Sequence, residues 1–155
     1  LMVFLFFGLL SVFGTFFLFS KQIDIRLLLP ASSVGLLSAA VLNLNNMRDL
    51  ESDKKSYKYT LAGYMGRKNS KVYHFSLILS AIALMIVFQG IMSFSYLMLF
   101  TWVAFAPLLI HLKIVYSIKN PKRFDPHLKL VALSTFAMSL LFASVLVIEQ
   151  LRQFL

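Results

Sequence analysis

Long apolar runs follow one another along the chain, and polar residues gather in the stretches between them. Each run approaches the roughly 20 residues that a helix needs to cross about 30 Å of hydrocarbon. The apolar positions are continuous within each run, which is typical of membrane-spanning helices. We therefore predict an all-α integral membrane protein with five transmembrane helices. The predicted spans cover about residues 1–19, 27–44, 73–92, 96–116 and 128–148.

Two prolines and one tight turn interrupt this pattern. Pro30 suits the first turn of the second span, where its missing N–H is not needed. Pro107 lies inside the fourth span, so we expect it to kink that helix. The third and fourth spans are joined by the stretch "SFS" at residues 93–95, which we predict to be a tight turn.

The composition agrees with a membrane location and excludes several kinds of site. Hydrophobic residues make up 59% of the chain and charged residues 14%, against roughly 25% charged in soluble domains. The mean hydropathy is +0.82. The chain has no cysteine, which excludes disulfides and thiolate sites. The net charge of +9 comes from bases between the spans, so we expect a lipid bilayer and anionic ligands as partners, and no nucleic acid.

The basic residues are distributed unequally between the two sides of the predicted bundle. Seven lie in the stretch 45–72 and five in the stretch 113–129, and both stretches fall on the same side. The other side has three, namely Lys21, Arg26 and Arg152. The positive-inside rule therefore predicts a multi-pass protein of the cell inner (plasma) membrane with the 45–72 loop in the cytoplasm and the C-terminus outside.

Acidic residues follow the second span on this predicted cytoplasmic side. Asn45, Asp49 and Asp53 are spaced at intervals of four, so they share a face if the second span continues as a helix. Two carboxylates at this spacing repel each other, and a divalent cation would reverse the sign of that interaction. Mg²⁺ suits such hard oxygen ligands and is commonly completed by water and substrate phosphates. A solvated loop whose acids balance its bases is the alternative at this point.

A resemblance to a known family begins at the same residues. The segment "NNMRDLESDKKSYKYTLAGYMGRKNSKVYH" resembles the second aspartate-rich motif of the UbiA-type membrane prenyltransferases, with N-N-x-R-D-x-x-x-D followed by K-x-T-L-A and G-R. Residues 3–8 resemble the text that precedes this motif in the family. The resemblance implies a nine-helix bundle with a central cavity open to the cytoplasm. The five spans look like its last five helices, so we expect residues 1–155 to be the C-terminal portion of one membrane prenyltransferase domain.

The same resemblance implies the activity. It is the Mg²⁺-dependent transfer of a polyprenyl group from polyprenyl diphosphate to an aromatic acceptor. The N-N-x-R-D wording is most like the branch that acts on 1,4-dihydroxy-2-naphthoate in menaquinone biosynthesis. The family's first aspartate-rich motif would belong to a missing N-terminal half of the same protein, so we expect this portion to be inactive by itself.

Site residues are carried over by matching the motif. The resemblance implies that Asp49 and Asp53 are catalytic and, with Asn45, hold Mg²⁺. The residues that it implies for binding the diphosphate are Asn45, Arg48 and Lys58. We add Lys54 and Arg67, because they are bases close to the acids in sequence and suit the remaining phosphate charge. The family often has Gly and Arg beside the matching lysine, where this chain has Tyr57 and Tyr59, so Tyr59 removes one positive charge from this part of the motif.

Two other functions remain open from the sequence. One is a sister prenyltransferase that acts on 4-hydroxybenzoate, homogentisate or haem. The other is a non-catalytic membrane protein whose basic loop binds anionic lipid. The chain also offers His74, His111 and His127 as titratable groups, but histidines near helix ends are more often interfacial or structural, and no general base is assigned.

Overall fold

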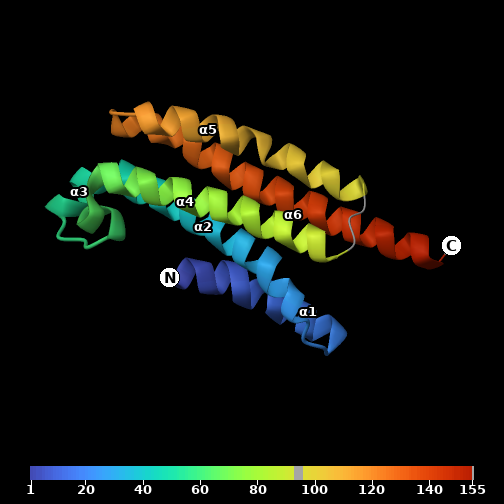
Figure 1. Cartoon of the computed structure of the whole chain (residues 1–155). Helices are drawn as coiled ribbons and strands as arrows, with labels where there is room; N and C mark the ends of the chain where they lie inside the picture. The colour runs from blue at the N-terminus through green and yellow to red at the C-terminus, as the bar shows by residue number, and fades with distance from the viewer. Residues whose placement is uncertain (93–95, 155) are drawn as a thin grey trace.

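The computed structural model describes residues 1–92 and 96–154, and all the regular structure in these ranges is helical (Figure 1). This confirms the predicted all-α fold. The predicted turn at residues 93–95 lies outside the described residues. The elements are η1 (Phe4–Leu10), α1 (Ser11–Ser20), η2 (Ile25–Leu27), α2 (Leu28–Arg48), α3 (Leu50–Lys55), α4 (Leu61–Ile91), η3 (Tyr96–Ala104), α5 (Ala106–Ser117), η4 (Pro121–Phe124) and α6 (Asp125–Phe154).

Four helical segments are long and apolar enough to cross a membrane, as judged by length and composition. They are Ile25–Arg48, Leu61–Ile91, Tyr96–Ser117 and Pro121–Glu149. The first apolar run forms a shorter helix, Phe4–Ser20. Four of the five predicted spans are thus confirmed as apolar helices of sufficient length, and a spanning role for the first run stays a prediction.

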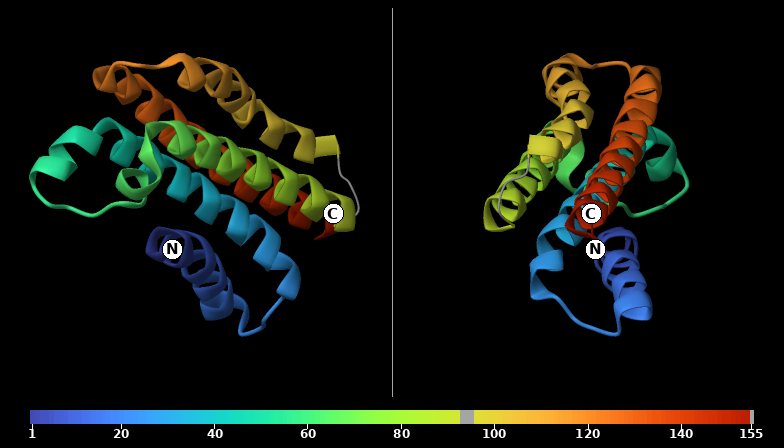
Figure 2. Two further views of the ribbon diagram at one scale, coloured as in Figure 1. Left: turned by 60° about the vertical axis from the view of Figure 1, so that its left-hand side comes forward. Right: turned by 90° about the vertical axis from the view of Figure 1, so that its right-hand side faces the viewer.

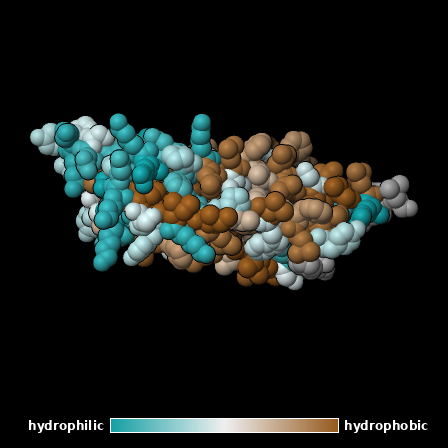
Figure 3. Space-filling model, turned by 90° about the horizontal axis from the view of Figure 1, so that it is seen from above, coloured by the Kyte–Doolittle hydropathy of each residue, from teal (hydrophilic) through white to brown (hydrophobic). Residues whose placement is uncertain are grey.

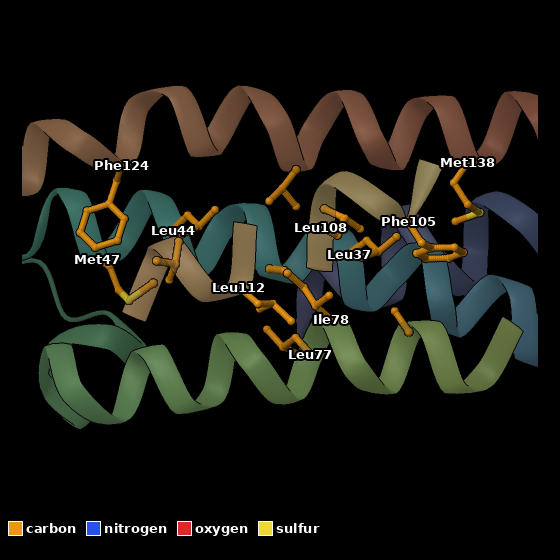
Figure 4. Close-up of a cluster of buried hydrophobic side chains, with 14 of the residues drawn as sticks. Leu37, Leu44, Met47, Leu77, Ile78, Phe105, Leu108, Leu112, Phe124 and Met138 are labelled. Carbon is orange, nitrogen blue, oxygen red and sulfur yellow. The ribbon is translucent and has the colours of Figure 1, made fainter. Parts of the chain in front are cut away.

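Helix α2 lies at the centre of the bundle. It packs against α4, η1 and α6. Figures 1 and 2 show this arrangement from different sides. The buried cluster in Figure 4 draws Leu37, Leu44 and Met47 from α2 and Ile78 from α4, with Phe105 beside α5. Most apolar side chains on the outer faces remain exposed, as expected of helices that face lipid or further helices.

Polar residues between the apolar helices start the next helix along the chain. The Asp24 side chain accepts a hydrogen bond from the Arg26 N–H, and Thr60 accepts one from the Gly63 N–H. Asn120 does the same for the Lys122 N–H before η4. Each interaction satisfies a backbone donor that has no partner within its own helix. Hydrophilic side chains gather at one end of the molecule, while its flank is largely hydrophobic (Figure 3).

Pro107 does not kink a continuous helix as we predicted. The fourth apolar segment changes from the 3₁₀ helix η3 to the α-helix α5, and Pro107 lies in the first turn of α5. A proline is tolerated there because the first helical N–H groups need no intrahelical acceptor. The segment therefore contains a junction between two helix types. Pro30 lies in the first turn of α2, as predicted.

Two glycines allow the N-terminal helix to touch α2 backbone to backbone. A Cβ atom on Gly8 would lie 2.6 Å from the Gly35 Cα atom and 2.7 Å from the Ala31 carbonyl oxygen. Rotating a side chain cannot relieve contacts with backbone atoms. Small residues allow this close approach between membrane helices.

We expect Gly8→Val to separate η1 from α2 and to lower the stability of the folded protein by about 1 to 3 kcal/mol, as overpacking typically does. Thermal unfolding in detergent would measure the change. Gly14→Val is the matched control, because nothing lies within 4 Å of a Cβ atom there. Equal melting temperatures for the two variants would contradict this packing.

Candidate active site

The end of α2 brings together the residues that are spaced at intervals of four. The Asp49 N–H donates to the Asn45 carbonyl at 2.9 Å, and the Asp53 N–H donates to the Asp49 carbonyl at 2.8 Å. The chain bends at Asp49, which ends α2 and precedes α3. The stretch 45–72, which we predicted as a loop, is thus largely helical, and its acidic residues follow one another turn by turn.

Arg48 is the centre of a polar network at this bend. Its Nε atom donates to Asp49 Oδ1 at 2.7 Å, and its Nη2 atom donates to Asp49 Oδ2 at 2.9 Å and to Asn45 Oδ1 at 2.7 Å. The Asn45 amide in turn donates to Asp49 Oδ2 at 3.2 Å. A fork of guanidinium donors on one carboxylate fixes the orientation of both side chains. The predicted residues Asn45, Arg48 and Asp49 therefore form one unit.

A second ion pair joins the last turn of α3 to the segment that follows it. Lys58 Nζ lies 3.1 Å from Asp53 Oδ1 and 3.3 Å from Oδ2, and the Lys58 N–H donates to the Asp53 carbonyl at 2.8 Å. Asp53 is 7% exposed. Between them, Tyr57 takes a left-handed conformation with φ of 54°, which brings the chain back toward Asp53. This conformation favours glycine, in accord with the Gly that the family often has there.

Asp125 is a member of the network that the sequence analysis missed. Its Oδ1 atom accepts a hydrogen bond from Arg48 Nη1 at 2.9 Å and thereby joins the start of α6 to the end of α2. The two residues are 77 positions apart. In the sequence, this contact was indicated only by the prediction that the stretches 45–72 and 113–129, which contain Arg48 and Asp125, lie on the same side of the membrane.

Asp49 is held in its charged form. The hydrogen bond from Arg48 lowers the pKa of Asp49 below its ordinary value of 3.8, and the charges of Arg48 and Lys58 act in the same direction. Carboxylates must be ionised to bind a cation. Asp49 is therefore available as a metal ligand throughout the neutral pH range.

The residues at the bend carry donor groups of the kind that Mg²⁺ prefers. Asn45, Asp49 and Asp53 offer one amide and two carboxylate groups, all of them hard oxygen ligands. Among residues 1–92 and 96–154, no group of three or more His, Cys, Asp or Glu side chains converges as a complete metal site. Mg²⁺ usually takes one or two carboxylates and completes its shell with water and phosphate oxygens, so the donor set suits Mg²⁺ held together with a diphosphate.

Of the two remaining predicted site residues, Lys54 lies beside Lys58 and Arg67 does not. Lys54 lines the same cavity of about 420 Å³ as Lys58, Tyr57 and Tyr59. Arg67 lies elsewhere, with its Nη2 atom 3.3 Å from Glu51 Oε1 and its Nη1 atom 3.2 Å from the Lys119 carbonyl. No side-chain hydrogen bond joins Arg67 to Asp49 or Asp53 in the described part of the chain.

Two largely apolar cavities follow one another along α2, starting at Asn45. The first, of about 420 Å³, lies between η1, α2 and α6. The second, of about 560 Å³, lies between α1, α2 and α6 and extends to Leu27 and Leu146 at the other end of the bundle. Together we call these two cavities the apolar groove. Asn45 of the polar network lines the first of the two cavities.

The three histidines form a hydrogen-bonded chain inside the bundle. His74 Nε2 lies 2.8 Å from His111 Nε2, and His111 Nδ1 lies 2.9 Å from His127 Nδ1. The rings come from α4, α5 and α6, so the chain ties these three helices together. None of the three lines the apolar groove, in accord with a structural role.

Comparisons with known proteins agree with this geometry. The model of the UbiA prenyltransferase family matches residues 1–141. The 1,4-dihydroxy-2-naphthoate octaprenyltransferase of Haemophilus influenzae is 36% identical over 146 residues, which are 94% of this chain and 47% of the relative. The enzyme of that name from Escherichia coli is 34% identical over 151 residues, or 96% of this chain and 48% of the relative.

The chain spans about half the length of these curated relatives. No solved structure gives a significant match. The family model covers most of the chain, including all of the polar network described above. The resemblance seen in the sequence is thereby confirmed: this multi-pass membrane chain belongs to the UbiA prenyltransferase family.

Proposed function

We propose that the protein transfers a polyprenyl group from polyprenyl diphosphate to an aromatic acceptor, with 1,4-dihydroxy-2-naphthoate as that acceptor in menaquinone biosynthesis. The observation that carries the proposal is the network of Asn45, Arg48 and Asp49 at the mouth of the apolar groove, with Asp53 and Lys58 one helical turn further on. Such an arrangement suits a ligand with a charged head and a long apolar tail. The names of the relatives support the choice of acceptor.

The diphosphate would be held by an exchange of partners. Each carboxylate is paired with a base, Asp49 with Arg48 and Asp53 with Lys58. With a magnesium diphosphate bound, Asp49, Asp53 and Asn45 would hold the metal, and Arg48 and Lys58 would donate to phosphate oxygens. Asp125 would stay paired with Arg48 when Asp49 binds the metal, and this ion pair would limit how far the guanidinium moves.

The chemistry then depends on charge and on exclusion of water. Mg²⁺, when bound, neutralises the leaving diphosphate as the allylic C–O bond breaks. Arg48 and Lys58 add positive charge on the protein side of the same group. The apolar groove would keep water from the electron-deficient carbon until the electron-rich ring of the acceptor attacks it. The attacked ring of 1,4-dihydroxy-2-naphthoate then loses its carboxylate as CO₂ and regains its aromaticity. We further propose that these 155 residues supply one half of the catalytic site, since they hold one aspartate-rich motif and match half of each relative.

A competition assay tests the acceptor. The protein that contains this chain, in membranes with Mg²⁺ and a polyprenyl diphosphate, should prenylate 1,4-dihydroxy-2-naphthoate in preference to 4-hydroxybenzoate when both are present at equal concentration. The product ratio, measured by chromatography, decides the question. A preference for 4-hydroxybenzoate would place the protein in a sister branch, and no transfer to either acceptor would contradict the proposed activity.

We also propose that the polar network faces the cytoplasm at the inner membrane. The two basic stretches lie at one end of the bundle, since Arg48 contacts Asp125 and Lys71 contacts Tyr116. Twelve Lys and Arg residues at this end against three elsewhere favour a cytoplasmic location.

Reporter fusions test the orientation. A reporter fused after Leu155 should be located outside the cytoplasm, because one apolar helix, Pro121–Glu149, separates it from the basic end of the bundle. A reporter inserted near Asn69 should be cytoplasmic. The reverse pattern, read with a pair of reporters that are each active on one side only, would overturn the proposed orientation.

A further inference from the structure

A basic pocket lies on the outer side of the bundle, where α5 ends and α4 begins its long straight part. The cavity has a volume of about 380 Å³. We call it the α4–α5 pocket. Its lining residues are Arg67, Lys68, Lys71, Tyr116, Ile118 and Lys119. Its bases belong to the two basic stretches, 45–72 and 113–129, which meet where Lys71 contacts Tyr116.

The walls of the α4–α5 pocket are fixed by hydrogen bonds between the two helices. Lys71 Nζ donates to the Tyr116 carbonyl at 2.8 Å and to the Ile118 carbonyl at 2.6 Å. Arg67 Nη1 donates to the Lys119 carbonyl at 3.2 Å. These carbonyls lie at and beyond the end of α5, where no helical N–H is left to bind them. Two bases of α4 therefore hold the end of α5 and keep the cavity open.

The charge of the pocket is largely uncompensated. Four bases line it, and the carboxylate that contacts one of them is Glu51, which is paired with Arg67. In the described part of the chain, the ammonium groups of Lys68 and Lys119 have neither a hydrogen-bond nor an ion-pair partner. Basic side chains that line one cavity repel one another, and an anion in the pocket would reduce that repulsion.

An apolar surface continues directly from the pocket along the flank of the bundle. Val72 and Phe75 follow Lys71 on α4 and are exposed, as is Ile114 on α5. Polar and apolar binding surfaces are thus placed in the order in which a phospholipid presents its headgroup and its acyl chains. Basic pockets between membrane helices on the cytoplasmic side are suited to anionic headgroups.

We propose that the α4–α5 pocket binds the headgroup phosphate of an anionic phospholipid, whose acyl chains lie against Val72, Phe75 and Ile114. Lys68 and Lys119 contact the phosphate. Lys71 and Arg67 hold the pocket in shape. The site goes beyond the proposed prenyl transfer and does not depend on it.

The pocket is separate from the proposed substrate site. The apolar groove lies between η1, α1, α2 and α6, whereas this pocket lies between α4 and α5. Neither Asn45 nor Asp49 nor Asp53 lines it. Arg67, which we predicted to bind the diphosphate, lines this pocket instead. Its link toward the substrate site is the ion pair with Glu51 of α3. We therefore favour a membrane lipid over the prenyl diphosphate as the occupant.

Native mass spectrometry of the detergent-purified protein tests the proposal. Phosphatidylglycerol and phosphatidylcholine with identical acyl chains are added in turn. We expect phosphatidylglycerol to be retained preferentially, and Lys68→Gln/Lys119→Gln to weaken its binding on the order of 20-fold, at roughly fivefold for each base near the membrane surface. Lys113→Gln/Lys122→Gln removes the same charge from exposed positions outside the pocket and should leave binding nearly unchanged.

Each other outcome overturns the proposal in a distinct way. Equal binding of the two lipids would show that no anion is selected. An equal loss in both double variants would show that only the overall charge matters. Displacement of phosphatidylglycerol by geranyl diphosphate would assign the pocket to the substrate. Because Lys68 and Lys119 lie outside the proposed catalytic residues, prenyl transfer in saturating lipid should be unaffected, so failure here is distinguishable from failure of the proposed function.

Discussion

Replacing Asp49 or Asp53 by asparagine should lower the rate of prenyl transfer by a factor on the order of 10² or more in the protein that contains this chain. Each substitution keeps the size of the side chain but removes one negative charge that would face the metal. Loss of one such electrostatic contact is worth about 3 to 4 kcal/mol in the transition state. Asp53→Asn also leaves Lys58, its partner at 3.1 Å, without a counter-ion.

Glu51→Gln is the matched control for these variants. Glu51 lies on the same short helix and also loses a charge, but it is exposed and contacts Arg67 rather than the network around Arg48. Its effect should be small. The rates should be measured over a range of Mg²⁺ concentrations, together with expression level and melting temperature. Near-normal activity of both aspartate variants at limiting Mg²⁺ would rule out the proposed metal ligands.

Filling the apolar groove should select against long substrates. Ala132 lines the groove on α6, in the cavity that begins at Asn45. Phenylalanine at this position occupies space that a polyprenyl tail would cross, so kcat/KM for a tail of eight isoprene units should fall by about tenfold or more, which is about 1.4 kcal/mol of lost binding. Geranyl diphosphate, whose tail is short, should be affected much less.

Leu133→Phe is the control for the groove. Leu133 is the next residue on α6, is exposed, and does not line the groove. Its substitution adds a ring to the outer face of the helix and should leave the preference for chain length unchanged. Equal losses for long and short substrates in Ala132→Phe would instead indicate a general disturbance of packing, and the groove would no longer be assigned to the tail.

The fold could be predicted from the sequence to the extent that it depends on continuous apolar runs. Their length indicates helices without any knowledge of neighbours, and the segments Ile25–Arg48 and Pro121–Glu149 contain the predicted spans completely. The 3₁₀ helix before Pro107 could not be predicted in this way. Its helix type depends on packing against α6 as well as on local propensity, and a proline within an apolar run is compatible with either a kink or a new start.

The candidate site also contains local contacts, which the sequence predicts, and tertiary contacts, which it does not. The link from Asn45 to Asp49 is a contact between consecutive helical turns, so the interval of four was enough to predict it. Asp125 reaches Arg48 only because α6 packs beside α2, and the histidines meet only because α4, α5 and α6 converge. Arg67 is close in sequence to Lys58, yet Gly66, with φ of 74°, redirects the helix between them. Spacing along the chain does not contain such tertiary contacts.

The central claim is that Asn45, Asp49 and Asp53 hold a diphosphate through Mg²⁺. Titration of the purified protein with a non-reactive thio-analogue of a prenyl diphosphate, with and without Mg²⁺, tests this claim most directly, because it requires no turnover. The account predicts that Mg²⁺ strengthens binding of the analogue at least tenfold, and that Asp49→Asn abolishes this gain while Glu51→Gln keeps it. Binding that is equally tight without Mg²⁺, or a gain that survives in Asp49→Asn, would contradict it.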